Sequence, residues 1–326
     1  MPFFGGNINW KDSRAHLLLL SKFINPKLDE QFQNDSWKMV LGENPQKAIK
    51  RFMKENMIRE SNLTETLIGA FTVNDLKEML KVYGLPVSGN KPQLAQRLAE
   101  NKPREIKSKT RNMECFICSE EGAKIAENFK TKEKLEQIEV ESKTFDFLND
   151  KNFVRAAQVM HFYEKNQVFS RGIGITWGVV SKVEIELLQM IFSVTPGILK
   201  GITDTDMHVL RILAGMQFLW GRSDKKWVPE DFELDFRFDP TTAARMVWFS
   251  ANGKHNLINY KKEGVKKVKF LVAYNACSYC LEFKDKEFKI TNVPELPHPN
   301  CEDDGYGCRC SFAPITKSWE EILNKS

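Results

Sequence analysis

Hydrophobic residues recur at three- and four-residue intervals over much of this chain, which is the pattern of helices with one buried face. Between residues 119 and 265 this spacing is found in FLNDKNFVRAAQVMHFYEKN, VEIELLQMIFSV and MHVLRILAGMQFLWG, and TTAARMVWFSANGKHNLINYKKEG is predicted to form a further helix. Residues 265–274 alternate instead and are rich in Val, Phe and Leu, which predicts a strand. Alternation of Phe and Leu over residues 232–238 predicts another, with its charged residues on the solvated face. These patterns predict a mainly α-helical, multidomain protein with a short β-hairpin in its C-terminal part.

Two short helices are predicted within residues 71–101. Thr72 is a suitable N-cap for the first helix and Gly84 a suitable stop. The second helix begins near Asn90 and tolerates Pro92 in its first turn. The connection GLPVSG places Leu85 and Val87 where they can complete a small core. The apolar positions at helical spacing are Val73, Leu76, Met79, Leu80, Tyr83, Leu94 and Leu98.

This stretch resembles a SAP domain, a helix–extended loop–helix module that binds DNA. The matching residues are Leu76, Lys77, Leu80, Gly84, Leu85, Ser88, Gly89, Lys91, Leu94, Arg97 and Leu98. The resemblance implies that Ser88, Gly89 and Lys91 meet the phosphate backbone. Lys77, Lys81 and Arg97 are expected to widen the contact. DNA binding by such a module is expected to be driven by phosphate contacts and to be sensitive to salt.

The charge distribution agrees with a DNA-binding role for this region. The whole chain has a formal net charge of +5. Residues 71–111 contain nine Lys and Arg residues against four Asp and Glu residues, so the net positive charge of this stretch equals that of the whole chain. A local basic surface most often binds nucleic acid. The alternative is a solvated lysine-rich linker, and the stretch NKPREIKSKTRN, which lacks apolar periodicity, is expected to be an exposed tether.

The cysteines form two sets in the sequence. Cys277 and Cys280 have the two-residue gap of a zinc knuckle and follow the strand predicted at 265–274. A hairpin over the next twenty residues would return the chain beside them and bring Cys301, Cys308 and Cys310 close. We expect one structural zinc ion bound by Cys277, Cys280 and two of these three cysteines. His298 is held in reserve as a ligand, and packing thiols or a redox role are the alternatives.

Cys115 and Cys118 have the same spacing but no second pair nearby. Buried thiols on one face of a helix are the favoured interpretation of this pair, and metal binding is the alternative.

Residues 264–313 resemble the C-terminal part of Mu-type phage head morphogenesis proteins. The matching residues are Gly264, Val265, Lys267, Val268, Cys277, Cys280, His298, Pro299, Asn300 and the CRC of 308–310. The resemblance implies a role in head assembly. The stretch EDDGYG interrupts the HPNCRC of that family and leaves open which cysteines are equivalent.

The chain is expected to divide into five regions. These are a helical N-terminal region at 1–70, the SAP-like module at 71–101, a basic linker at 102–118, a helical domain at 119–263 and a zinc-binding β-hairpin tail at 264–326. No signal segment and no apolar run long enough to cross a bilayer is found, and seven cysteines, an odd number, argue against a full disulfide framework. We therefore expect a cytoplasmic protein without a membrane partner.

The expected function is that of a non-enzymatic DNA-binding protein with a structural zinc site, of phage or prophage origin, whose helical domain contacts a protein assembly partner. A phage head assembly protein is one alternative. A DNA-processing enzyme such as a nuclease is the other, although no nuclease motif is found and His161 and His208 are expected to be core residues. The sequence leaves open an active site of an unfamiliar kind in the helical domain at 119–263.

Overall fold

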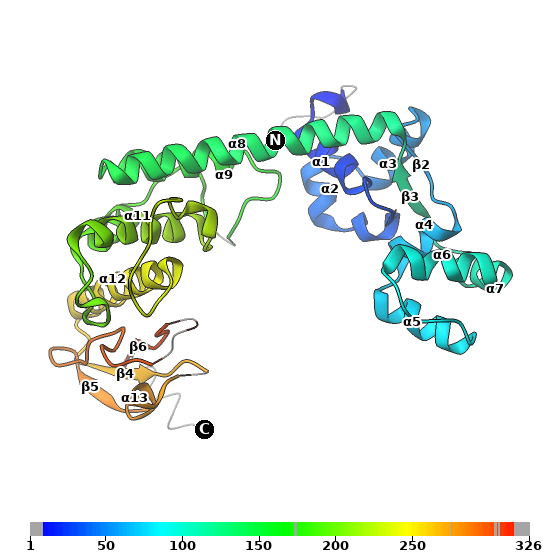
Figure 1. Cartoon of the computed structure of the whole chain (residues 1–326). Helices are drawn as coiled ribbons and strands as arrows, with labels where there is room; N and C mark the ends of the chain where they lie inside the picture. The colour runs from blue at the N-terminus through cyan, green and yellow to red at the C-terminus, as the bar shows by residue number, and fades with distance from the viewer. Residues whose placement is uncertain (1–8, 173–174, 275, 303–304, 306, 316–326) are drawn as a thin grey trace. The chain divides into compact units, whose positions relative to one another are not determined.

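The computed structural model describes residues 9–172, 175–274, 276–302, 305 and 307–315. This part of the chain is mainly helical and has two small antiparallel sheets (Figure 1), which confirms the predicted fold class. The chain separates into two compact units. The first unit comprises residues 1–138 and 167–170, and the second comprises residues 139–166 and 171–326. None of the described helices combines the length and the hydropathy that crossing a bilayer requires.

The N-terminal part of the first unit packs short helices around a small sheet. Its helices are η1 (Trp10–Asp12), α1 (Arg14–Lys22), η2 (Asp29–Phe32), α2 (Asp35–Leu41), α3 (Pro45–Lys54) and the beginning of α8 (Glu120–Asn149). Its sheet has the strand order β1 (Lys27–Leu28), β3 (Cys115–Cys118), β2 (Ile58–Glu60), and both pairings are antiparallel. The buried rings of Trp10, Phe23 and Phe52 lie in the core that these elements share.

Four helices build a second core in the first unit. They are α4 (Leu63–Ala70), α5 (Val73–Val82), α6 (Lys91–Asn101) and α7 (Pro103–Thr110). The predicted helices are present as α5 and α6, with Thr72 and Asn90 as their N-caps. Their core contains Leu67, Leu76, Met79, Leu80, Leu94, Ala95, Leu98 and Ile106. We call α4 to α7 with their connections, residues 62–110, the four-helix module.

The basic stretch 101–112, predicted to be an exposed tether without regular structure, is largely helical and packs on the module through its buried residues. Residues 103–110 form α7, and residues 115–118 form β3. Ile106 is fully buried in the core of the four-helix module, so one apolar side chain fixes the basic helix against its neighbours. Cys115 and Cys118 are buried as predicted, but they belong to a strand that pairs on both sides and not to a helix.

The second unit contains long helices around one hydrophobic core. After the C-terminal part of α8 come α9 (Phe153–Lys165), α10 (Lys182–Ser193), η3 (Gly197–Leu199), α11 (Asp204–Trp220), η4 (Lys225–Trp227) and α12 (Pro240–Lys262). These helices agree with the periodic stretches of the sequence. The strand predicted at 232–238 is absent: this segment is irregular, and it places Phe238 in the core. Alternating rings can be buried from a loop, so the pattern alone did not require a partner strand.

The C-terminal part of the second unit adds a sheet to the helices. It contains β4 (Lys267–Leu271), α13 (Ser278–Leu281), β5 (Glu287–Lys289) and β6 (Ser311–Pro314), with β4 in the centre and both pairings antiparallel. The predicted hairpin is present as β4 and β5, and β6 completes it. Val268, Phe270 and Phe312 join the same core as the helices. The tail therefore packs on the helical part and does not form a core of its own.

Candidate nucleic-acid interface and metal centre

The loop between α5 and α6 depends on two glycines. Gly84, two residues after the end of α5, has a φ of +66°, and the Leu85 amide donates to the Leu80 carbonyl at 2.9 Å. Gly89 has a φ of +119°, and a Cβ built there would lie 2.7 Å from the Oε1 of Gln93. Residues other than glycine rarely adopt a backbone conformation with positive φ. The two glycines therefore let the chain turn and bring Ser88 and Gly89 to the start of α6.

The first turn of α6 has few free amide groups. The Asn90 side chain accepts from the Gln93 amide at 3.2 Å, and the Gln93 side chain accepts from the Asn90 amide at 2.9 Å. Pro92 has no amide hydrogen. Lys91 is therefore the residue of this turn whose amide is left for an external acceptor, next to the positive end of the helix dipole. Ser88 and Gly89 are exposed beside it.

Arg97, which the sequence predicts to widen the DNA contact, also makes contacts within the module. One guanidinium nitrogen, Nη1, donates to the carbonyl of Ser88 at 3.0 Å and also to the carbonyl of Pro86. The side chain thus ties α6 to the loop that carries Ser88 and Gly89. Arg97 shapes this loop from within the module.

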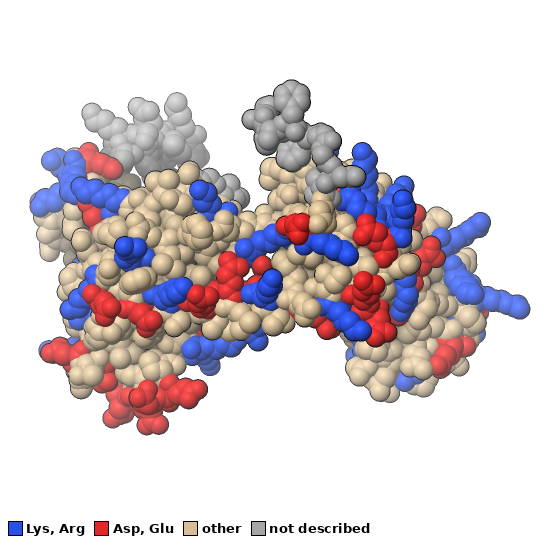
Figure 2. Space-filling view, turned by 90° about the horizontal axis from the view of Figure 1, so that it is seen from above, with Lys and Arg blue, Asp and Glu red and all other residues tan. Residues whose placement is uncertain are grey.

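The predicted lysines differ in their surroundings. Lys91 is half-buried, and desolvation lowers its pKa, with the charge of Lys27 acting in the same direction. Lys77 is half-buried on α5, whereas Lys81 is exposed and pairs with Glu78 at 2.7 Å. Figure 2 shows Lys and Arg side chains interspersed with Asp and Glu side chains over the face that it presents. At the α6 N-terminus itself, the charge of Lys91 is joined by that of Lys27 and opposed by that of Asp75.

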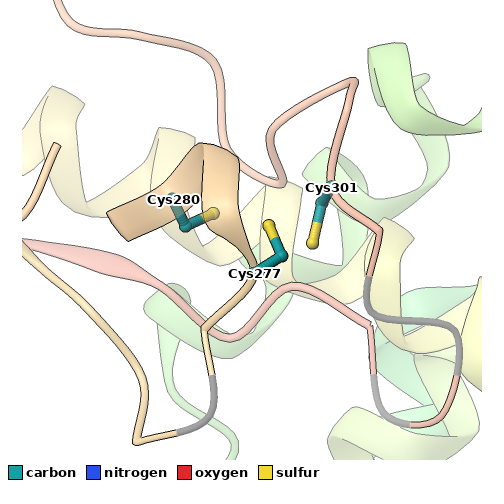
Figure 3. Close-up of side chains that lie close together, drawn as sticks. All are labelled: Cys277, Cys280 and Cys301. Atoms are coloured by element: carbon teal, nitrogen blue, oxygen red, sulfur yellow. The ribbon is translucent and has the colours of Figure 1, made fainter. Parts of the chain in front are cut away.

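Five cysteines gather in the C-terminal part of the second unit. Two groups have all their sulfur atoms within 4.8 Å of one another: Cys277 with Cys280 and Cys301, and Cys280 with Cys308 and Cys310. Cys277 is the N-cap residue of α13, and Cys280 follows on the same short helix. The thiols of Cys277, Cys280 and Cys301 lie close together in Figure 3. Cys277 and Cys280 thus lie close to the later cysteines, as the sequence predicts.

The geometry of the cysteine cluster fits a tetrahedral metal site. The sulfurs of Cys280 and Cys308 are 3.7 Å apart. A tetrahedron with metal–sulfur bonds of about 2.3 Å has an edge of about 3.8 Å between sulfurs. Cys280, Cys301 and Cys308 are buried, while Cys277 and Cys310 are half-buried. The cluster can therefore hold a metal ion, and it offers one thiol more than four-coordination needs.

The thiols of this cluster also influence one another's pKa. Hydrogen bonding with Cys280 lowers the pKa of Cys308 and lowers the pKa of Cys310 to about 3. Hydrogen bonding with Cys301, and then with Cys308 and Cys310, raises the pKa of Cys280. Thiols packed this closely share protons, and a metal ion that bound them would displace those protons.

His298 lies beside the cluster but is not grouped with the sulfur atoms. Its ring stacks on Tyr279, with the two centroids 5.8 Å apart and the planes 17° from parallel, and also contacts Phe283. Its Nδ1 accepts from the Asn300 amide at 3.2 Å, and its carbonyl accepts from the Cys301 amide at 2.9 Å. In this structure His298 holds the segment that carries Cys301.

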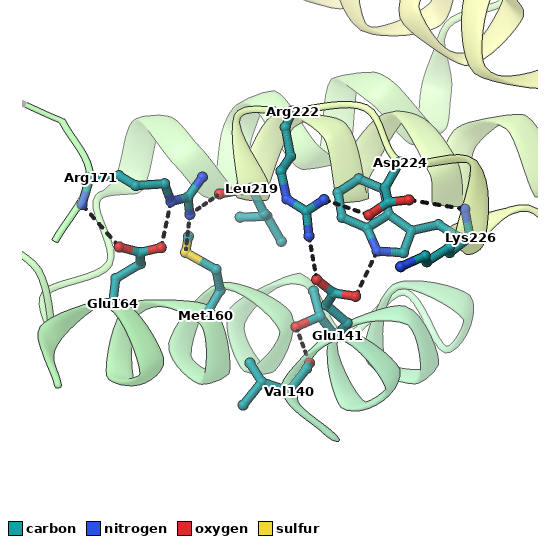
Figure 4. Close-up of polar contacts among 11 residues, drawn as sticks. Val140, Glu141, Met160, Glu164, Arg171, Leu219, Arg222, Asp224 and Lys226 are labelled. Atoms are coloured by element: carbon teal, nitrogen blue, oxygen red, sulfur yellow. Dashed lines mark hydrogen bonds and ion pairs between the residues drawn. The ribbon is translucent and has the colours of Figure 1, made fainter. Parts of the chain in front are cut away.

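A polar network that sequence reasoning did not find fastens the helices of the second unit (Figure 4). Arg171 pairs with the buried Glu164 and lies 5.7 Å from the ring of Trp220. Arg222 contacts Glu141 and lies 4.9 Å from the Trp227 ring, whose Nε1 donates to the same carboxylate at 3.0 Å. Isolated Arg and Glu residues in a sequence give no signal for such a network.

Beside this network lies a cavity of about 840 Å³ whose lining includes His161, Arg171, Trp177 and Glu184. His161 is buried as predicted, with its Nε2 2.7 Å from a Glu184 carboxylate oxygen. The same expectation was wrong for His208, which is half-exposed and lies 3.1 Å from the side-chain oxygen of Asn149. Two of the ionisable groups of the cavity, His161 and Glu184, thus pair with each other, and Arg171 pairs with Glu164 outside the lining.

The comparisons with known proteins give one family. The model of the SAP domain family matches residues 68–101, which cover the last part of α4, all of α5 and all of α6. No curated protein and no solved structure matches the chain. The resemblance of residues 264–313 to phage head morphogenesis proteins is not shown by these comparisons.

Proposed function

We propose that this protein binds DNA through the four-helix module and that a structural zinc ion holds its cysteine cluster. The SAP family match at residues 68–101 is the observation that carries the DNA-binding part. The metal part rests on five cysteine sulfurs gathered into two overlapping groups.

The α6 N-terminus supplies the chemistry that a phosphate group requires. The Lys91 amide is left for an external acceptor, Gly89 lets a backbone approach closely, and the Lys91 side chain adds a charge. Lys77 and Lys81 on α5 extend the basic surface, and Ser88 offers a hydroxyl beside it. These groups recognise phosphates and sugars and carry no base preference, so we expect binding to DNA of any sequence.

The cysteine cluster is proposed as a zinc site with a structural role. Thiolate-rich tetrahedral sites are typical of zinc, and sites closed by four protein ligands stabilise a fold without catalysing a reaction. We propose Cys277, Cys280 and two of Cys301, Cys308 and Cys310 as ligands. Free thiols persist in a reducing compartment, which supports a cytoplasmic location.

The test of DNA binding is a titration of labelled duplex with the full chain and with Lys91→Glu. Lys91→Glu should lower the affinity about tenfold for every sequence and reduce the salt slope by about one. Lys38→Glu, which reverses an exposed charge on α2, is the matched control and should bind like the unchanged protein. Unchanged affinity of Lys91→Glu, or a strong preference for one short sequence, would contradict the proposal.

A further inference from the structure

The C-terminal sheet has one buried and one exposed face. Val268 and Phe270 of β4 are buried, whereas Lys267 and Leu271 are exposed and Lys269 is partly exposed between them. Side chains alternate along a strand, so these three residues lie on the outer face. Residues directly opposite on neighbouring strands share a face. The pairings Lys267 with Lys289 and Lys269 with Glu287 therefore extend this outer face across β5.

This part of the chain is basic. Residues 261–290 contain eight lysines and four acidic residues. Two of the acidic residues form ion pairs on or beside the sheet: Glu287 with Lys267 at 3.1 Å and Asp285 with Lys269 at 2.9 Å. The remaining lysines include Lys289 on β5 and Lys284 and Lys286 in the turn that precedes it, all of which are exposed. An anionic partner fits this excess of positive charge.

Exposed rings and apolar side chains stand in the segment that follows β4. The Tyr274 side chain is fully exposed, and Tyr279 keeps 36% of its surface exposed although its ring stacks on His298. Leu271 and Leu281 are 44% and 50% exposed. Within the described chain nothing covers Tyr274, so its ring does not contribute to the fold. Tyr274 follows the end of β4 by three residues, and an exposed ring in such a lysine-rich segment provides a stacking surface for an unpaired base.

We propose that the outer face of β4 and β5, together with Tyr274 and Tyr279, forms a second nucleic-acid-binding surface that takes single-stranded nucleic acid. Lysines attract the backbone and the tyrosines stack on unpaired bases, which a duplex does not offer. The segment that carries both tyrosines ends in the cysteine cluster, because Cys277 and Cys280 flank Tyr279. The surface is thus held in shape by the same cysteines as the proposed metal site.

The test is an anisotropy titration of a labelled 20-nucleotide oligothymidylate with the full chain. All the proteins compared carry Lys91→Glu, which weakens binding by the four-helix module. This background should retain binding to the single strand. Adding Tyr274→Ala should lower that affinity about tenfold, and adding Lys289→Glu should reduce its salt slope. Phe162→Ala on α9 removes another ring, 69% exposed in the second unit, and is the matched control that should change nothing.

Ultraviolet crosslinking to the same oligonucleotide gives an independent measurement and should attach it to peptides from residues 266–289. Loss of all single-strand binding in the Lys91→Glu background, or equal behaviour of Tyr274→Ala and Phe162→Ala, overturns the second surface. Neither result bears on the proposed duplex binding, which the separate duplex titration of Lys91→Glu tests. A surface that docks protein would also leave the oligonucleotide titrations unaffected by Tyr274→Ala.

Discussion

Arg97 carries a positive charge in the region proposed to bind phosphate, yet its guanidinium donates to the carbonyls of Pro86 and Ser88. A hydrogen bond from a charged group contributes about 1.5–3 kcal/mol, so these contacts can fix the loop. Lysine keeps the charge but lacks the planar donor group that reaches two carbonyls. The charge and the shape of Arg97 can therefore be separated by substitution.

Arg97→Lys and Arg97→Gln should both lower duplex affinity about tenfold, because both release the loop that carries Ser88 and Gly89. Arg97→Lys should leave the salt slope of binding unchanged. Anisotropy titrations at several salt concentrations measure both quantities, with Arg155→Lys on α9 as the control. If Arg97→Lys binds like the unchanged protein, the side chain acts through its charge and not through the loop.

Glu65 gives a prediction for pH. Arg59 donates to both of its carboxylate oxygens at 2.8 Å, and this contact lowers the pKa of Glu65 below its ordinary value. A lowered folded-state pKa stabilises the fold above the unfolded value, near 4.3, and this stabilisation is lost as the pH falls through the folded-state pKa. Glu65→Gln should therefore destabilise the first unit by less than about 1 kcal/mol at pH 7 and show a weaker loss of stability in acid. Urea unfolding between pH 3 and pH 7 measures this, and parallel pH profiles would contradict the assignment.

At the scale of elements, local signals predicted the helices well. The capping residues Thr72 and Asn90 and the stop at Gly84 mark α5 and α6, because cap chemistry is decided by nearby residues. By contrast, α7 could not be predicted, because Ile106 is its one buried apolar residue in a basic stretch, and a single apolar residue gives no periodicity. Residues 232–238 alternate like a strand but bury their rings without a partner strand. Both errors concern contacts that lie far away in sequence.

The cysteine cluster could be predicted in part. The spacing of Cys277 and Cys280 indicated a knuckle, and the hairpin of β4 and β5 explains how the later cysteines return to it. The spacing of the cysteines could not predict that all five sulfur atoms lie in one cluster, because this depends on how β6 pairs with β4. The role of Arg97 depends likewise on a loop conformation and could not be predicted from its position in the motif.

Metal analysis should find about one zinc ion per chain. Cys280→Ser should lose it, because Cys280 belongs to both groups of thiols. Cys115→Ser, which alters a buried thiol of β3, is the control and should keep the metal. Because the proposed site takes only two of Cys301, Cys308 and Cys310, one of the three single substitutions at these positions should keep the zinc ion. Full zinc content in Cys280→Ser would contradict the proposed site.

At the scale of the whole molecule, the two proposed sites belong to different cores. The four-helix module packs around Leu76, Leu80 and Leu94 in the first unit. Cys280, Cys301 and Cys308 belong to the core of the second unit, which they share with Phe270 and the long helices. Because side chains of separate cores do not support one another, loss of metal should act on one unit and leave the other folded.

Chelation of the full chain should therefore loosen the second unit and spare duplex binding. Binding energy of a structural zinc ion is folding energy, so its removal should expose residues 265–315 to proteolysis and abolish single-strand binding. Duplex affinity should stay within about twofold, since the contacts around Lys91 and Gly89 do not involve the cysteines. Limited proteolysis with mass spectrometry and paired titrations with and without chelator measure these effects, and restored zinc should reverse them. If duplex affinity falls in parallel with zinc content, the two sites are coupled, and the separation of function between the two cores is wrong.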